Sequence, residues 1–188
     1  SNKLEGNEDK RFNNNGKIAP KAFIGTGLLS APFLFVGNLF NYFSSNPLMN
    51  YGLLFYSLSS VTYLFLSIIM IYKLLNSVNS NISFKFIFLL VFGSGVPYFA
   101  FERYSMSHIF EIFTITLTIY LSHMFYKNNE KTNLYAFFIP ISILLAILVR
   151  WVNYYTFLLP YLTFLLFRGA YKNNLLLRKN KYFFGGVL

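Results

Sequence analysis

The sequence predicts an all-α protein, a polytopic transmembrane helical bundle, and two observations carry this prediction. The 188 residues are 55% hydrophobic and only 12% charged. A soluble domain carries about twice that share of charge, because its surface has to face water. The charged residues are also missing from long runs of the chain, which include residues 22–72, 132–149 and 151–167. Such runs are typical of bilayer spans, which need roughly 17–25 apolar residues.

The chain divides into four expected parts. Residues 1–21 are polar and rich in asparagine, which indicates an external loop or tail. Residues 22–43 are apolar but interrupted by glycines and by Pro32. Such breakers favour a broken juxtamembrane helix that dips into the membrane, with a true span as the alternative. We expect the transmembrane bundle over residues 44–168 and a basic cytoplasmic segment over residues 169–188.

Within the bundle we expect five spans, near residues 51–73, 85–101, 105–126, 133–149 and 152–168. The last two belong to one apolar stretch with Arg150 in the middle. A single helix from Lys131 to Arg168 would extend roughly 57 Å, nearly twice the hydrocarbon core of a bilayer. The chain must therefore reverse direction near Arg150.

Basic residues between the spans predict the orientation. With alternating spans, nine of them fall on one side: Lys73, Lys85, Lys127, Lys131, Arg168, Lys172, Arg178, Lys179 and Lys181. The positive-inside rule places that side in the cytoplasm, and Arg103 and Arg150 on the outer side. Residues 1–21 would then lie outside as well. The simplest explanation is an upstream transmembrane helix, so we expect this chain to be a piece of a longer protein.

Composition also excludes some classes of function. Without cysteine, the chain can form neither a disulfide framework nor a cysteine-based metal site. The net charge of +10 could suggest a nucleic-acid partner. The basic residues, however, sit at the ends of apolar runs, and no base-stacking motif lies between them. We therefore expect no nucleic-acid binding.

The first candidate site is the turn at residues 101–111, FERYSMSHIFE. Its polar members are Glu102, Arg103, Ser105, Ser107, His108 and Glu111. Either serine can cap the following helix, whose free N–H groups would then face outward and favour an anion. His108 and Glu111 are three residues apart and share a helix face.

A carboxylate one turn into a span is costly unless it is paired or lines a wet cavity. One interpretation is therefore an ion pair that fixes helix packing. A second is a polar site for a charged head group. A third is a divalent metal bound by His108 and nearby carboxylates, although such spacing is common by chance. We expect no metal ligand set here, and no cofactor is indicated.

Arg150 is the second candidate, followed by Trp151 and Asn153. One interpretation is an interfacial arginine beside an aromatic belt residue. The other is a phosphate clamp, because a guanidinium can bind phosphate through two parallel hydrogen bonds. In the predicted topology Arg150 lies on the same side as the 101–111 turn.

Three stretches form a pattern when they are taken in order: AFIGTGLLSAPFLF (22–35), YFAFERYSMSHIFEIFTITLTIYL (98–121) and ISILLAILVRWVNYYTFLLP (141–160). Together they resemble the GT-C superfamily of membrane glycosyltransferases, which includes protein O-mannosyltransferases and aminoarabinose transferases. The resemblance covers about residues 20–165. Two departures stand out: Trp151 replaces the proline that usually follows the arginine, and no residue matches the family's catalytic aspartate in the first external loop.

The resemblance implies an enzyme of a bacterial cytoplasmic membrane that transfers a sugar from a polyprenyl-phosphate carrier to an acceptor at the outer face. It implies donor contacts by Arg150, Asn153, Arg103, Ser105, Ser107, His108 and Glu111. Glu102 is the local candidate for a base on the acceptor hydroxyl, and the main aspartate is expected upstream. The alternatives are a transporter, flippase or polymerase subunit for lipid-linked sugars, or a scaffold without chemistry.

Overall fold

In the computed structural model the described residues are helical, apart from short turns and one very short strand pair. The structure describes residues 13–14, 17–18, 24–43, 50–78, 82–104, 106–127 and 132–167. Strands β1 (Asn13–Asn14) and β2 (Lys17–Ile18) pair antiparallel. They fall in the segment predicted as a polar loop. The basic segment at residues 169–188 lies outside the described residues.

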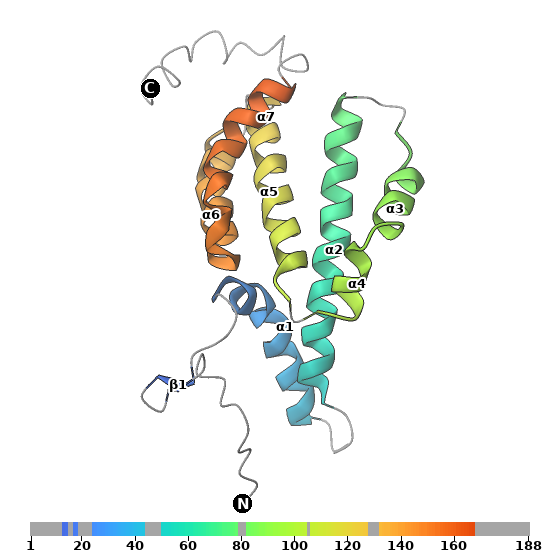
Figure 1. Ribbon diagram of the computed structural model, residues 1–188, viewed down its shortest axis with the longest axis vertical. Helices are drawn as coiled ribbons and strands as arrows, with labels where there is room; N and C mark the ends of the chain where they lie inside the picture. The colour runs from blue at the N-terminus through green and yellow to red at the C-terminus, as the bar shows by residue number, and fades with distance from the viewer. Residues whose placement is uncertain are drawn as a thin grey trace, which may run out of the picture.

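The described residues form eight helical elements, which follow one another in sequence (Figure 1). They are α1 (Ile24–Phe43), α2 (Tyr51–Val78), α3 (Phe84–Phe92), α4 (Val96–Phe101), α5 (His108–Lys127), α6 (Thr132–Val149), the 3-10 helix η1 (Trp151–Leu158) and α7 (Leu159–Phe167). The turn predicted near Arg150 is present, because α6 ends at Val149 and η1 begins at Trp151.

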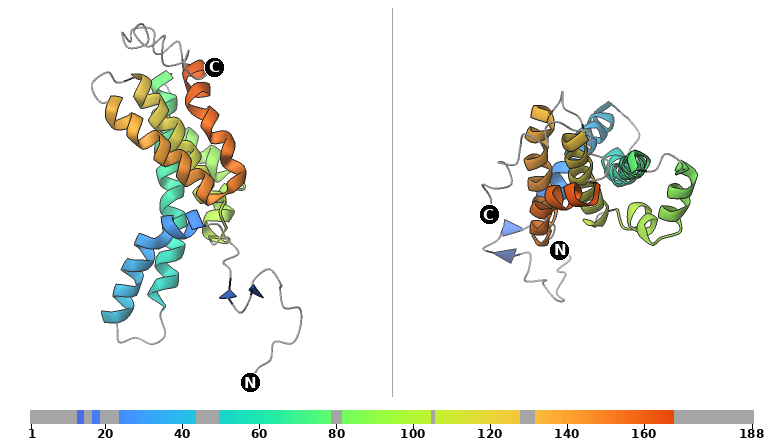
Figure 2. Two further views of the ribbon diagram at one scale, coloured as in Figure 1. Left: turned by 90° about the vertical axis from the view of Figure 1, so that its left-hand side faces the viewer. Right: turned by 90° about the horizontal axis from the view of Figure 1, so that it is seen from above.

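Helix α2 is the longest element, and other helices pack along its two halves. At its first residue, the Tyr51 backbone N–H donates to Asn41 Oδ1 at 2.9 Å. In its middle, the Tyr63 hydroxyl donates to the Leu29 carbonyl at 2.8 Å. These contacts align α1 antiparallel to the first half of α2. Helices α3 and α4 lie on the flank of α2 away from α6 and α7, as the view from above in Figure 2 shows.

Tyr63 is also where α5 begins to pack on α2. Its ring lies 5.9 Å from Phe33 of α1, 5.6 Å from Phe110 and 4.5 Å from Phe113 of α5. Leu29, Phe110 and Val149 form a buried cluster beside it. From this level α1 runs toward one end of α2 and α5 toward the other (Figure 1).

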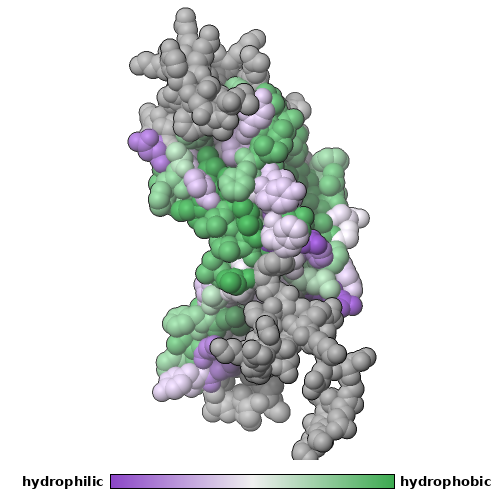
Figure 3. Space-filling model, turned by 60° about the vertical axis from the view of Figure 1, so that its left-hand side comes forward, coloured by the Kyte–Doolittle hydropathy of each residue, from purple (hydrophilic) through white to green (hydrophobic). Residues whose placement is uncertain are grey.

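Helices α5, α6 and α7 with η1 pack through small hydroxyl side chains. The buried members include Thr114, Thr118, Ser122, Ser142, Thr156 and Thr163. The Thr118 hydroxyl donates to Ser142 Oγ at 3.0 Å across the α5–α6 contact. Small residues let helices approach closely where lipid, not water, surrounds the bundle. The outer surface is correspondingly hydrophobic over much of the face in Figure 3.

Within the described part of the chain, three helices are long and apolar enough to cross a bilayer: Ile24–Phe43, Tyr51–Ser77 and His108–Lys127. Asn133–Val149 is apolar but shorter. This composition indicates a membrane protein. The predicted count of five spans is not confirmed, because the segments near residues 85–101 and 152–168 are each divided. The first consists of α3, a turn at residues 93–95, and α4; the second consists of η1 and α7.

The prediction of a broken helix at residues 22–43 is wrong, since α1 is continuous over Ile24–Phe43. Its glycines mark close packing. A Cβ on Gly25 would lie 2.3 Å from the Val149 backbone nitrogen, and one on Gly37 would lie 2.7 Å from the Tyr51 carbonyl oxygen. Glycine at these two positions lets α1 touch the backbone of α6 and of α2 without breaking the helix.

The first testable prediction concerns Gly25. Gly25→Ala should destabilise the intact protein by roughly 1–3 kcal/mol, because the added methyl group meets backbone that cannot rotate away. Gly27→Ala is the matched control, since nothing lies within 4 Å of the Cβ position there. Thermal unfolding of the purified protein in detergent measures both. Equal stability of the two variants would contradict the close approach of α1 and α6.

Candidate functional site

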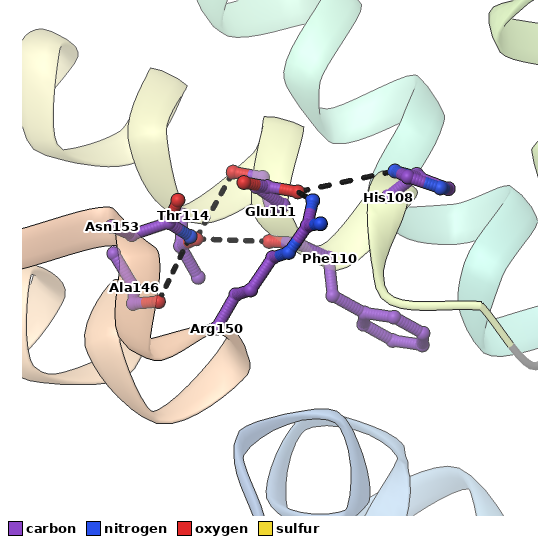
Figure 4. A network of polar contacts seen from close by, with 7 residues as sticks. All are labelled: His108, Phe110, Glu111, Thr114, Ala146, Arg150 and Asn153. Atoms are coloured by element: carbon purple, nitrogen blue, oxygen red, sulfur yellow. Dashed lines mark hydrogen bonds and ion pairs between the residues drawn. The ribbon is translucent and has the colours of Figure 1, made fainter. Parts of the chain in front are cut away.

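A polar cluster lies where α5 begins and α6 ends (Figure 4). Arg150 Nη1 lies 3.3 Å from Glu111 Oε2. His108 Nδ1 lies 4.0 Å from the same carboxylate oxygen. Residues 39 positions apart in sequence are thus joined, and two of the predicted site regions become one site.

The geometry at the end of α6 presents Arg150 to Glu111. Its backbone is extended, with φ −160° and ψ 121°, so the helix stops there. The Arg150 N–H still donates to the Ala146 carbonyl at 3.1 Å, and the Asn153 N–H donates to the Arg150 carbonyl at 2.9 Å. The chain therefore reverses with its polar backbone groups engaged, as a helix end buried among other helices requires.

The members of the cluster differ in exposure. The Glu111 side chain is 16% exposed, whereas those of Arg150 and His108 are 43% and 41% exposed. The carboxylate is therefore the inner member and depends on its partners for charge compensation. The guanidinium is the outer member and keeps donors free for a second anion, because it carries five N–H groups in a planar fork.

Two aromatic residues that sequence reasoning did not select complete the surroundings. The Phe99 ring lies 4.5 Å from the His108 imidazole. The Tyr155 phenol is close enough to interact electrostatically with both Glu111 and Arg150. No sequence signal singled them out, since Tyr and Phe are common throughout this chain and only the fold brings these two to the cluster.

Asn153, which the resemblance implied as a donor contact, is fully buried. Its Nδ2 donates to the Ala146 carbonyl at 3.1 Å. Within the described part of the chain its Oδ1 has no hydrogen-bond partner. The side chain thus lies beneath the cluster and fastens η1 to the last turn of α6.

The other predicted residues lie nearby in sequence but outside the ion-paired group. Glu102 and Arg103 are exposed at the end of α4. Arg103 Nε donates to the Tyr98 hydroxyl at 3.1 Å, and this hydrogen bond raises the pKa of Arg103. The Ser107 carbonyl accepts the Glu111 N–H at 2.8 Å and so opens α5. Ser105 lies outside the described residues.

The arrangement suits anion binding better than metal binding. Among the described residues, no three His, Asp or Glu side chains lie close enough together to hold a metal ion. A guanidinium that is fixed on one side by a carboxylate and open on the other can bind a phosphate or carboxylate group.

The second prediction follows from the unequal burial of Glu111 and Arg150. Arg150→Met should destabilise the protein by roughly 1–3 kcal/mol, because it leaves the inner carboxylate without its partner. Glu111→Gln should cost less than about 1 kcal/mol, since the outer guanidinium can hydrate. The double variant should recover part of the loss. Thermal unfolding of all three measures this, and a purely additive double variant would contradict a coupled pair.

Comparison of the chain with protein-family models, with curated protein sequences and with solved structures finds no match. Assignment of a function therefore depends on the chemistry of the cluster and on the sequence resemblance.

Proposed function

We propose that this chain is part of a membrane glycosyltransferase that moves a sugar from a polyprenyl-phosphate carrier to an acceptor at the outer face of the membrane. The observation that carries the proposal is the presentation of Arg150. Its guanidinium is held by Glu111 at a chain reversal, yet the side chain stays 43% exposed. A half-open guanidinium at the end of a membrane helix bundle is suited to a lipid-linked phosphate.

The lengths of the packed helices support a position of the Arg150 cluster at the membrane boundary. α5 and α6 have 20 and 18 residues, or about 30 Å and 27 Å. η1 followed by α7 has about the same length, near 30 Å, because a 3-10 helix rises about 2.0 Å per residue. These lengths match a hydrocarbon core of about 30 Å. A bilayer centred on these helices has the Arg150 cluster at one edge.

The same placement of the bilayer accommodates five crossings, of which one is interrupted by the turn between α3 and α4 and another changes from the 3-10 form of η1 to the α-helix α7. The Phe84 ring at the start of α3 contacts Tyr72, and Tyr104 beyond α4 contacts Tyr56, 16 residues earlier on α2. α3 and α4 in series thus traverse about 24 Å of the height of α2. Together with α2, α5, α6 and η1–α7, they make five passes.

Helix α1 then belongs to the outer surface. It packs on the half of α2 that lies beyond the Tyr63 level, end to end with α5 (Figure 1). Two helices of 20 residues placed end to end reach about 60 Å, so both cannot cross one hydrocarbon core. We assign α5 to the core and α1 to a juxtamembrane position on the side of the Arg150 cluster.

Sugar transfer in this site would break the bond between the anomeric carbon and the carrier phosphate oxygen. A new bond forms to the acceptor hydroxyl oxygen, and the acceptor proton passes to a carboxylate base. The polyprenyl phosphate leaves with the negative charge, which Arg150 would stabilise. Glu102 is the base candidate within this chain, at the same end as the cluster; Glu111 serves to hold Arg150.

The third prediction tests the orientation. Single cysteines replacing Arg103 and Lys85 should label from opposite sides of sealed vesicles, because these residues lie at opposite ends of the α3–α4 pass. The measurement is reaction with a membrane-impermeant maleimide before and after permeabilisation. Labelling of both from the same side would rule out the proposed topology. Lys131, predicted on the Lys85 side, lies outside the described residues.

The fourth prediction tests the function in the intact protein. Arg150→Lys should leave membrane insertion normal but weaken donor use by about 1.5–3 kcal/mol, since a lysine cannot form the paired hydrogen bonds of a guanidinium. Sugar transfer by purified protein is the measurement, and Lys127→Ala at the far end of α5 is the control. Normal transfer by Arg150→Lys would refute the phosphate role. Carrier translocation without any transfer would instead support a flippase.

A further inference from the structure

The 3-10 helix η1 is unusually long for its type. It spans eight residues, Trp151–Leu158, whereas runs longer than three or four residues are uncommon because the hydrogen-bond geometry is poorer than in an α-helix. With three residues per turn, positions three apart share a face. Asn153 and Thr156 are such a pair, and both are fully buried. The 3-10 repeat thus sets which side chains of η1 face the bundle.

Pro160 disfavours an α-helical continuation of α7 toward Arg150, although α6 accommodates Pro140 within a continuous helix. An α-helix would need an N–H at position 160 to donate to the Thr156 carbonyl, and proline has none. Its ring would also collide with that carbonyl. In the structure the Leu159 N–H donates to the Thr156 carbonyl instead, which is a 3-10 bond. One end of η1 is therefore fixed by the proline.

Asn153 fixes the other end. Its backbone N–H binds the Arg150 carbonyl and its side-chain N–H binds the Ala146 carbonyl. An α-helical Asn153 would donate its backbone N–H to Val149, one residue earlier. The side-chain bond to Ala146 depends on η1 reaching down to the last turn of α6.

Whether η1 is a 3-10 helix or an α-helix determines how far its Arg150 end extends. Eight residues rise about 16 Å as a 3-10 helix and about 12 Å as an α-helix, and the two forms differ by about 160° in total rotation. A change to the α form would withdraw the Arg150 end by about 4 Å. That displacement is larger than the 3.3 Å that separates Arg150 Nη1 from Glu111 Oε2, so the Arg150 side chain would have to change its conformation to keep the contact.

We infer that Pro160 and Asn153 are positioning residues: together they hold residues 151–158 in the 3-10 form and so place the Arg150 guanidinium at the edge of the bundle, against Glu111. Pro160 acts from ten residues away, through the helix between them. This inference rests on the proposed function only for its consequence in sugar transfer; the conformational part stands on the contacts above.

The test measures the length of η1 directly. Because the 188 residues contain no cysteine, nitroxide labels can be attached at introduced cysteines replacing Val152 and Leu166, both exposed at 42% and 81%. The backbone separation of these positions is about 24 Å with η1 in the 3-10 form and about 21 Å with it α-helical. Pulsed electron–electron double resonance in lipid nanodiscs resolves a change of about 3 Å in the distance between the labels.

Pro160→Ala in the intact protein should shorten this distance by about 3 Å, since an alanine N–H can bind the Thr156 carbonyl. Asn153→Leu, of similar volume, should shorten it as well by releasing the other end. Pro140→Ala is the matched control, because Pro140 lies inside the continuous helix α6 and its loss should leave the distance unchanged. An unchanged distance in Pro160→Ala would overturn the inference.

Sugar transfer, measured on the same unlabelled variants, gives the second readout. Pro160→Ala should reduce transfer at least tenfold, by raising the donor KM, while Pro140→Ala behaves like the parent. The positioning role is wrong if Arg150→Lys impairs transfer while Pro160→Ala, with its label distance shortened, transfers normally. If Arg150→Lys itself transfers normally, the proposed function fails, and the distance measurement alone decides whether Pro160 sets the form of η1.

Discussion

The reversal of the chain between α6 and η1 is the constraint on which the rest of the described structure depends. A helix end inside a bundle leaves carbonyl groups that cannot be hydrated, so they need partners from the protein. Here the Ala146 carbonyl receives two donors, the Arg150 backbone N–H and the Asn153 side chain. The extended residue between the two helices is thereby held in one place. α1 then packs on the same corner, with Gly25 against Val149.

The backbone conformation of Arg150 determines which charged partner its side chain meets. Because Arg150 is extended, its side chain leaves the axis of α6 and reaches the first turn of α5, where Glu111 lies. The carboxylate compensates the arginine and is itself shielded, while the guanidinium keeps an open side. A purely structural ion pair and an anion site share this geometry. The open side of Arg150 is the feature that a structural pair would not require, and it is the basis for proposing a phosphate ligand.

The contacts that hold the helices together are those expected of a bundle surrounded by lipid. Lipid gives helices no hydrophobic reason to associate, so close contact between small residues and hydrogen bonds between hydroxyl groups take over. The Thr118–Ser142 bond joins α5 to α6, and Tyr63 joins α1 to α2 through the Leu29 carbonyl. The glycines of α1 also allow close contact between helices. Its glycines suggest a broken helix in the sequence, but Gly25 and Gly37 are places where another backbone comes near.

The sequence by itself determined the helical class, the membrane environment, the polar segment at 101–111 and the reversal at Arg150, because each depends on local composition and on the length a helix can reach. It also selected Glu111, His108 and Arg150, since a charge in an apolar run is costly unless it has a purpose. Tertiary structure alone decided that these three residues meet and that Asn153 is buried. Those outcomes depend on contacts between segments far apart in the chain, which no local pattern encodes.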